Sequence, residues 1–334
     1  MSPIFLLVLI VILAWLYDFW NGANDCANSI ATTISTHALS FKTAVFLSAI
    51  FNFLGALFST EVAKTIGKGI LNQEVITPFL LIFSLIGTIL WTWLSTKFGI
   101  PISVTHALIG GLIGPGLVSA GFSSLIFKGL VKIAIGMFLA PIIGFLASAL
   151  FFIFIVWTIK LFVKASPSKI QNFFRMVQRI TTPLVSLAHG LNDTQNAMGI
   201  ITIALFSAGY LKSFVVPLWV KIGSGLFMAL GTIYAGQKVV RTVGQKIYKI
   251  SPLHGCATES ASSLLIILQS LFGIPLSTTQ VITAGVMGIG AVERKALVNW
   301  RKLIEIFFVW IFTIPGSVII SGSLFFIFKL ILRQ

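Results

Sequence analysis

Charged residues are scarce in this chain. Only 9% of its 334 residues are charged, whereas 57% are hydrophobic. A soluble globular domain carries a far larger charged share, about 25%, so this class is excluded. Apolar runs at 2–17, 79–94, 133–159 and 304–332 approach or exceed the roughly 20 residues that span a bilayer. The sequence therefore predicts a polytopic integral protein of the cell membrane, surrounded by lipid.

The first apolar run, residues 2–17, has no basic leading region and no small-residue cleavage site. These two features mark a secretory signal peptide, which is removed from the mature protein. We therefore expect the run to be retained as a membrane span.

Cysteine is almost absent as well, with two residues, Cys26 and Cys256, far apart in apolar segments. Neither has a Cys or His neighbour at metal-ligand spacing, so a disulfide framework and a thiolate metal site are excluded. We expect two buried free thiols.

The net charge of +15 comes from Lys and Arg at the ends of apolar segments, for example Lys160, Lys164 and Lys238. Cations at such ends face lipid headgroups. This placement argues against a nucleic-acid partner.

Two of the eight acidic residues stand in a repeated motif. Residues 21–28 read Asn-Gly-Ala-Asn-Asp-Cys-Ala-Asn, and residues 189–196 read His-Gly-Leu-Asn-Asp-Thr-Gln-Asn. A second pair follows in the same order, Phe-Gly-Ile-Pro-Ile-Ser-Val-Thr-His at 98–106 and Phe-Gly-Ile-Pro-Leu-Ser-Thr-Thr-Gln at 272–280. A third, weaker match joins 64–70 to 241–247. Ordered matches of this kind indicate an internal duplication.

The duplication divides the chain into two transmembrane repeats, residues 1–163 and 170–334, joined by a short linker at 164–169 that contains a proline. Apolar runs and breakers predict an all-α protein with about ten to twelve membrane segments. The expected helices cover 3–20, 22–37, 41–60, 78–97, 101–118, 125–163, 170–187, 189–208, 212–236, 254–272, 275–292 and 301–332.

Several of these segments begin at Gly or Gly-x-Pro interruptions, in corresponding positions of both halves. Short interrupted helices in matching places point to a transporter binding site. Irregular backbone at membrane depth is tolerated only where it is buried or lines a cavity. We favour inverted repeats with broken half-helices by analogy with known transporters, since the basic residues do not decide the orientation.

The Asn-Asp motifs place amides and one carboxylate on a single helix face. Asn21, Asn24, Asp25 and Asn28 have helical spacing, and the second motif repeats it. A charged carboxylate at the bilayer centre costs at least ~2.5 kcal/mol, so both stripes should face the protein interior. Hydrogen bonding between helices explains a single Asn, but hardly two matched stripes with a carboxylate each.

The Pro-x-Ser motifs predict helix starts inside the membrane. Ser103 and Ser277 follow Pro101 and Pro275, where free N–H groups carry partial positive charge. Such a start binds an anion without Lys or Arg. Taken alone, Ser after Pro is an ordinary helix cap; the duplication favours a binding role.

Neither pair of motifs contains Lys or Arg, although Asp25, Asp193 and the nearby Glu259 are acidic. An anion beside these carboxylates is repelled unless the acids are protonated or cations bind with it. Carboxylate and amide oxygens suit small hard cations. The residues therefore favour an anion symporter driven by Na⁺ or H⁺.

These motifs resemble those of the PiT family of inorganic phosphate transporters over both halves of the chain. The resemblance implies a helical transporter with inverted repeats that takes up phosphate with Na⁺, or with H⁺ in some members. Three positions depart from the family pattern: Val104 replaces Thr, Gln280 replaces His, and Asn52 stands where many members carry Glu.

With this resemblance, the phosphate-binding candidates are Asn24, Asp25, Ser103, Thr105, Asn192, Asp193, Ser277, Thr278 and Thr279. The candidates for binding Na⁺ as the coupling ion are Asn21, Asp25, Asn28, Thr32, Asp193, Asn196, Glu259 and Gln280. No other cofactor is expected.

Three alternatives stay open at this point. A H⁺-coupled phosphate or metal-phosphate symporter and a sulfate permease fit the same scaffold, although sulfate offers no hydrogen to Asp25 or Asp193. An enzyme is not expected, because no nucleophile–base pair or metal-ligand cluster is evident. A passive channel suits duplicated broken helices less well. A homodimer is possible but is not needed to complete the site.

Overall fold

The computed structural model describes residues 2–332 except 235–238, 241 and 244–247. The described residues form helices and no strand, apart from one isolated bridge between Leu71 and Leu125. The all-α prediction is confirmed. The α-helices are α1 (Pro3–Ser35), α2 (Phe41–Gly55), α3 (Glu61–Gly69), α4 (Pro78–Phe98), α5 (Val104–Ala120), α6 (Phe127–Phe162), α7 (Pro167–Ser207), α8 (Leu218–Tyr234), α10 (Pro252–Leu271), α11 (Thr278–Arg294) and α12 (Trp300–Ile331).

The breaks expected at the Asn-Asp motifs are wrong. α1 runs unbroken for 33 residues and α7 for 41 residues, each carrying its motif inside the helix. The glycines in the motifs allow close helix packing instead. A Cβ on Gly22 would lie 2.3 Å from the Met228 carbonyl oxygen, and one on Gly190 would lie 2.1 Å from the Asn52 carbonyl oxygen.

The breaks expected at the two proline motifs are present. α4 ends before Gly99, whose φ of 70° is left-handed, and α10 is followed by Gly273 with a φ of 65°. Only glycine adopts this conformation without strain. Extended residues then lead to α5 and α11, so two new helices begin in the interior of the bundle.

Smaller differences concern helix ends. The expected helix 41–60 ends at Gly55 and a separate α3 begins at Glu61. α7 begins at Pro167, inside the expected linker, because proline is well suited to the first turn of a helix. The expected helix 212–236 begins only at Leu218. Its end and most of the third sequence match at 241–247 lie outside the described residues.

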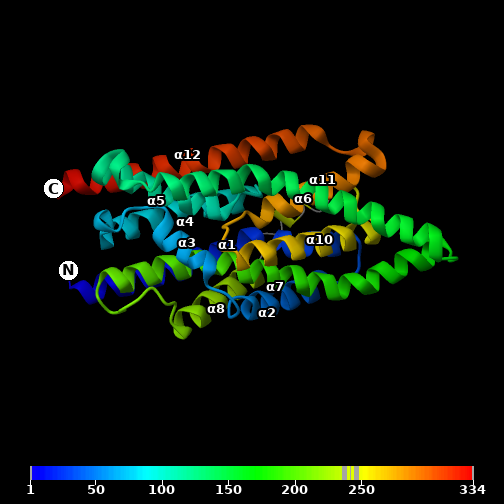
Figure 1. Ribbon diagram of the computed structural model, residues 1–334, viewed down its shortest axis with the longest axis horizontal. Coiled ribbons are helices and arrows are strands. Elements are labelled where there is room, and N and C mark those ends of the chain that lie inside the picture. Colours follow the sequence, from blue (N-terminus) through cyan, green and yellow to red (C-terminus); the bar gives the residue numbers. More distant parts are fainter. Residues whose placement is uncertain (1, 235–238, 241, 244–247, 333–334) are drawn as a thin grey trace.

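The helix contacts of one half recur in the other. α1 packs against α8 and α4, while α7 packs against α2 and α10; α5 packs against α12, while α11 packs against α6. In Figure 1, α1 begins beside the N-terminus, whereas α7 begins at the opposite tip, where α6 ends, so these two helices run in opposite directions. Opposite directions of matched helices are what inverted repeats require.

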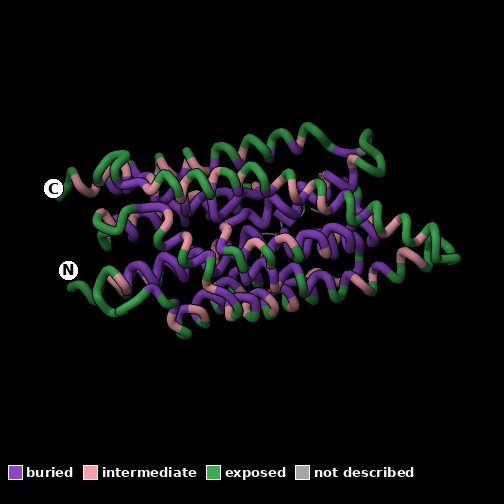
Figure 2. The backbone as a smooth tube through the Cα atoms, viewed as in Figure 1, coloured by how far each residue is buried: buried purple, intermediate pink, exposed green. Residues whose placement is uncertain are grey.

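Burial follows the membrane prediction. Figure 2 shows buried residues along the middle of the bundle and exposed ones on the outer faces of the long helices. Many exposed side chains on α6 and α12 are apolar, including Phe138, Trp157 and Phe312, as expected where a helix faces lipid. Among the described helices, α1, α4, α6, α12 and the segment Val104–Ser124 are long and apolar enough to cross a bilayer.

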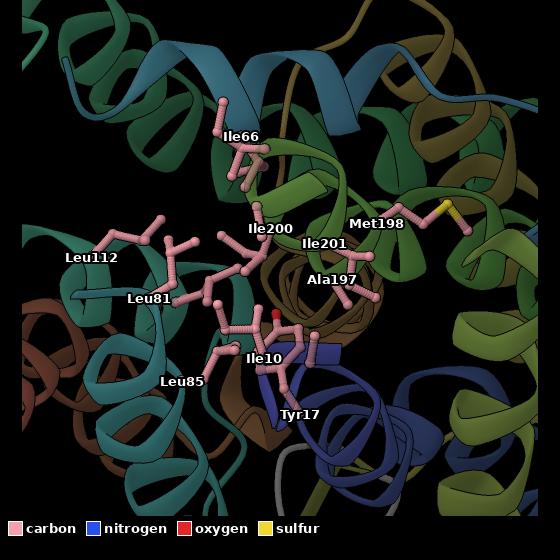
Figure 3. Packing of buried hydrophobic residues seen from close by; sticks show 14 of the residues in the cluster. Ile10, Tyr17, Ile66, Leu81, Leu85, Leu112, Ala197, Met198, Ile200 and Ile201 are labelled. Carbon is pink, nitrogen blue, oxygen red and sulfur yellow. The ribbon is translucent and has the colours of Figure 1, made fainter. Parts of the chain in front are cut away.

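The largest apolar cluster holds α1 against α4, α5 and α7. Figure 3 shows Ile10 of α1 beside Leu85 of α4, with Tyr17 of α1 next to them; Ile200 and Ile201 of α7 belong to the same cluster. The Tyr17 hydroxyl accepts a hydrogen bond from Asn196 at 3.3 Å, so the cluster borders the polar motif directly. Apolar packing on one side of α1 and α7 therefore fixes where their polar stripes point.

We expect Gly190→Ala to destabilise the fold. Its Cβ would meet the Asn52 backbone at 2.1 Å, so α2 and α7 must separate. Overpacking of this kind costs about 1–3 kcal/mol. Thermal unfolding in detergent should show a lower midpoint, whereas the control Gly69→Ala, whose nearest contact is at 3.7 Å, should not. Equal midpoints for both variants would contradict the close-packing role.

Candidate anion and cation site

Two carboxylates from different halves meet in the middle of the bundle. Asp25 on α1, Asp193 on α7 and His189 on α7 offer ligand atoms that all lie within 4.8 Å of one another, and all three are buried. The two repeats contact each other here, so Asp25 and Asp193, which are 168 positions apart in the sequence, form one cluster. Both Asn-Asp motifs face the interior of the bundle, as expected, and their carboxylates lie together there.

The start of α11 lies against both carboxylates. The Thr278 hydroxyl donates to Asp193 Oδ2 at 3.1 Å, and the Thr279 hydroxyl donates to Asp25 Oδ1 at 3.1 Å. Ser277 caps the helix, its Oγ accepting the Gln280 N–H at 3.3 Å. The first-turn N–H groups therefore point into the region of the two acids.

The start of α5 is built in the same way. Ser103 Oγ accepts the His106 N–H at 3.3 Å, and Thr105 Oγ1 accepts a hydrogen bond from Asn196 at 3.0 Å. Val104, buried in the first turn, occupies the place that Thr278 has in α11. One hydroxyl that α11 aims at a carboxylate is therefore missing from α5, and the two helix starts are unequal.

The motif amides connect the two halves in a matched pattern. Asn24 donates to the Ile100 carbonyl at 3.4 Å and Asn192 to the Leu276 carbonyl at 2.9 Å, each within its own half. Asn28 donates instead to Thr279 at 2.8 Å, in the opposite half. Asn196 makes the equivalent hydrogen bond from the second half, to Thr105 of the first half. Each helix start is thus positioned by one amide from each repeat.

His189 belongs to the cluster although it was not among the predicted site residues. Its Nε2 lies 3.2 Å from Asp193 Oδ2, and its Nδ1 lies 2.9 Å from the Asn52 Oδ1. Asn52 in turn donates to Thr232 at 3.0 Å. The sequence signal was present, since His189 occupies the first position of the second polar stripe. Its partner on α2 could not be read from local sequence.

Glu259 is surrounded by a cage of hydrogen-bond donors in a separate cluster. One of these donors, Thr32, lies one turn after Asn28 on α1. Glu259 Oε1 accepts from Thr32 at 2.5 Å, from Thr33 at 2.8 Å and from Gln178 at 3.0 Å. Its Oε2 accepts from Thr181 and Thr182. Two of the predicted cation ligands, Thr32 and Glu259, are therefore in contact, but in a cluster separate from that of Asp25 and Asp193.

The side-chain oxygens of the two remaining candidates have no hydrogen-bond partner among the described residues. Gln280 lines an apolar cavity of about 440 Å³ between α6, α11 and α12. Asn21 is fully buried, and neither of its side-chain atoms has a hydrogen-bond partner in the described part of the chain.

The electrostatics of the main cluster are unbalanced. No Lys or Arg among the described residues is buried, and the basic side chain beside the carboxylates in that part of the chain is His189, at 3.2 Å from Asp193. Two charges within 4.8 Å repel by at least about 3 kcal/mol at an effective dielectric constant of about 20. The arrangement can hold a cation between the acids, and it offers an anion two helix N-termini.

We expect Glu259→Gln to lower stability by about 1–3 kcal/mol, because an amide nitrogen would replace an acceptor oxygen and face buried donors. The measurement is thermal unfolding in detergent. The matched control is Glu74→Gln, a carboxylate exposed in the loop before α4. If the two substitutions shift the midpoint equally, the cage does not depend on the carboxylate.

Comparison with known proteins agrees with this geometry. Residues 21–321 match the Phosphate transporter family. A probable low-affinity inorganic phosphate transporter of Rhizobium meliloti is 42% identical over 323 residues, with 96% of each chain covered. A protein of the same description from Bacillus subtilis is 39% identical, with 98% of each chain covered.

A solved structure described as the sodium-dependent phosphate transporter has the same fold. Its TM-score is 0.88 at 27% sequence identity, with 98% of this chain and 99% of that chain covered. These relatives are transporters and not enzymes. Together with the paired motifs and their meeting in the structure, the matches show that this membrane protein belongs to the phosphate transporter family.

Proposed function

We propose that this chain is a secondary active symporter that takes up inorganic phosphate together with Na⁺ by alternating access. It would cross the cell membrane several times as two inverted repeats. The observation that carries the proposal is the pairing of Asp25 with Asp193 within 4.8 Å, beside the N-terminus of α11 and without a buried Lys or Arg among the described residues.

Phosphate would be held between the starts of α5 and α11. Ser103 and Ser277 accept backbone N–H groups as caps, so their hydroxyl hydrogens are free for an anion. Thr105 and the free N–H groups of the first turns would add donors. Thr278 and Thr279, which donate to Asp193 and Asp25 in this structure, would turn their hydroxyl hydrogens toward the anion when it binds. Asn24 and Asn192 hold the chain before each start in place.

Asp25 and Asp193 suit phosphate better than sulfate. Phosphate keeps at least one hydrogen near neutral pH and can donate it to a carboxylate, whereas sulfate carries none. A buried acceptor left without a donor costs about 1–3 kcal/mol. The site should therefore prefer phosphate.

Cations would bind because the carboxylates and the anion repel each other. Oxygens of Asp25, Asp193, Asn28 and Asn196 would coordinate Na⁺ near the anion, since hard cations prefer oxygen ligands. The Glu259 cage with Thr32 would be a further cation position. Asn21 and Gln280 would have to turn toward the acids to take part. A proton on one carboxylate of the pair is the second candidate, which also relieves the repulsion.

Alternating access would depend on the contacts between the two repeats. Asn28 and Asn196 each bridge to the opposite half, so both halves share one site. α1 and α7 run antiparallel (Figure 1), as two repeats related by a pseudo-two-fold axis in the membrane plane would. Such a pair of repeats could exchange conformations to give two packings of similar energy. Rocking one bundle against the other would expose the shared site to each side in turn.

We expect radiolabelled phosphate uptake into proteoliposomes to require an inward Na⁺ gradient and to resist competition by sulfate. A pH gradient without Na⁺ should leave uptake near the background of empty liposomes. Uptake that follows the pH gradient alone would support the H⁺-coupled alternative. Uptake that is insensitive to both gradients would contradict the symport proposal.

We expect Asp25→Asn and Asp193→Asn each to reduce coupled uptake to the background of empty liposomes, because one ligand charge is lost at the shared site. The fold should survive, since the amide is nearly isosteric, and the thermal midpoint in detergent reports this. Glu74→Gln, an exposed carboxylate, should transport like the parent chain. Full uptake by either Asp variant would refute the site.

A further inference from the structure

A second buried carboxylate lies on the same stripe of α1. Asp18 precedes Asp25 by seven residues, two helical turns or about 10 Å along the axis. Its side chain is fully buried, and neither oxygen has a hydrogen bond among the described residues. An ionised carboxylate in this position is strongly destabilised unless a positive charge accompanies it.

Other unpartnered polar atoms surround Asp18. Asn21, one turn along α1, has neither side-chain atom bonded, and the Ser224 hydroxyl on α8 also lacks a partner within the described chain. All three residues are completely buried. Ser224 is close enough to act on the Asp18 carboxylate. These residues together carry four acceptor oxygens, two of them on the carboxylate, on the packed helices α1 and α8.

α1 and α8 pack tightly beside these residues. Gly223 of α8 accommodates the Trp15 ring of α1, and Gly231 accommodates the Phe19 backbone. Asp193 is the charged group of another helix that acts on Asp18, and it is acidic. On α8, Lys221 donates to the Leu57 carbonyl and the exposed Tyr234 packs against Phe19. Within the described residues, no basic side chain forms a hydrogen bond with Asp18.

The matching positions in the other half are hydrogen-bonded to each other. Ser186 stands seven residues before Asp193, as Asp18 stands before Asp25, and its hydroxyl bonds to Ser48 of α2 at 3.0 Å. The two serines are therefore hydrogen-bonded to each other. Between α1 and α8, Asp18 stands in place of one serine, and its carboxylate oxygens have no hydrogen-bond partner in the described chain.

We propose that Asp18, Asn21 and Ser224 form a Na⁺ site distinct from the Asp25–Asp193 site. A single carboxylate matches one positive charge, so a monovalent cation fits where a divalent ion would remain unbalanced. Carboxylate, amide and hydroxyl oxygens are ligands for a hard cation. One cation would satisfy several acceptors at once, whereas a proton satisfies one. The site would add a coupling ion to the proposed symport, on which this role in transport rests.

The test is the thermal midpoint of the purified chain against Na⁺ concentration, without phosphate and at constant ionic strength with choline. The Asp25→Asn background removes the response of the main site. In it, Na⁺ should still raise the midpoint, and K⁺ should do so less. Adding Asp18→Asn should weaken the apparent Na⁺ affinity about tenfold or more, as loss of a charged ligand implies.

Ser224→Ala should weaken Na⁺ affinity severalfold, and the matched Ser48→Ala should leave it unchanged; this pair decides the matter if Asp18→Asn does not fold. An unchanged Na⁺ response in both Asp18→Asn and Ser224→Ala would overturn the proposal. A midpoint that follows pH and ignores Na⁺ would overturn it in favour of a proton. Na⁺-independent phosphate uptake, by contrast, would defeat the symport proposal while leaving this binding result intact.

Discussion

The repulsion between two buried carboxylates is the constraint on which the rest of the site depends. Asp25 and Asp193 come from opposite halves and lie within 4.8 Å of each other, and the part of the bundle that the structure describes buries no Lys or Arg. Such a pair is stable only with a proton or a cation between its members. The unfavourable arrangement persists because the surrounding packing holds α1 and α7 together, and it makes anion binding depend on positive charge from solution.

Close packing explains why the pair is so well fixed. Gly22 and Gly190 let α8 and α2 approach α1 and α7 until backbone touches backbone. The interrupted helices then supply α5 and α11. The first turn of α11 contacts both carboxylates, and that of α5 contacts Asn196. Long continuous helices therefore carry the acids, and short broken helices carry the proposed anion donors, so the proposed rocking motion would move both groups together.

The sequence predicted the helical class, the breaks at Pro101 and Pro275, and the interior position of Asp25 and Asp193, because these depend on local pattern and on duplication. It misread Gly22 and Gly190 as breaks, since a glycine that permits close packing looks the same as one that ends a helix. The contact of His189 with Asn52 and the donor cage of Glu259 arise from distant segments. Local periodicity carries no information about such pairings.

The central claim is that anion and cation bind together. It is tested most directly by calorimetric titration of the purified chain with phosphate at increasing Na⁺ and fixed ionic strength. Reciprocal coupling requires that phosphate affinity rise with Na⁺, and that Na⁺ affinity rise equally with phosphate. Phosphate affinity that is independent of Na⁺ would contradict the account.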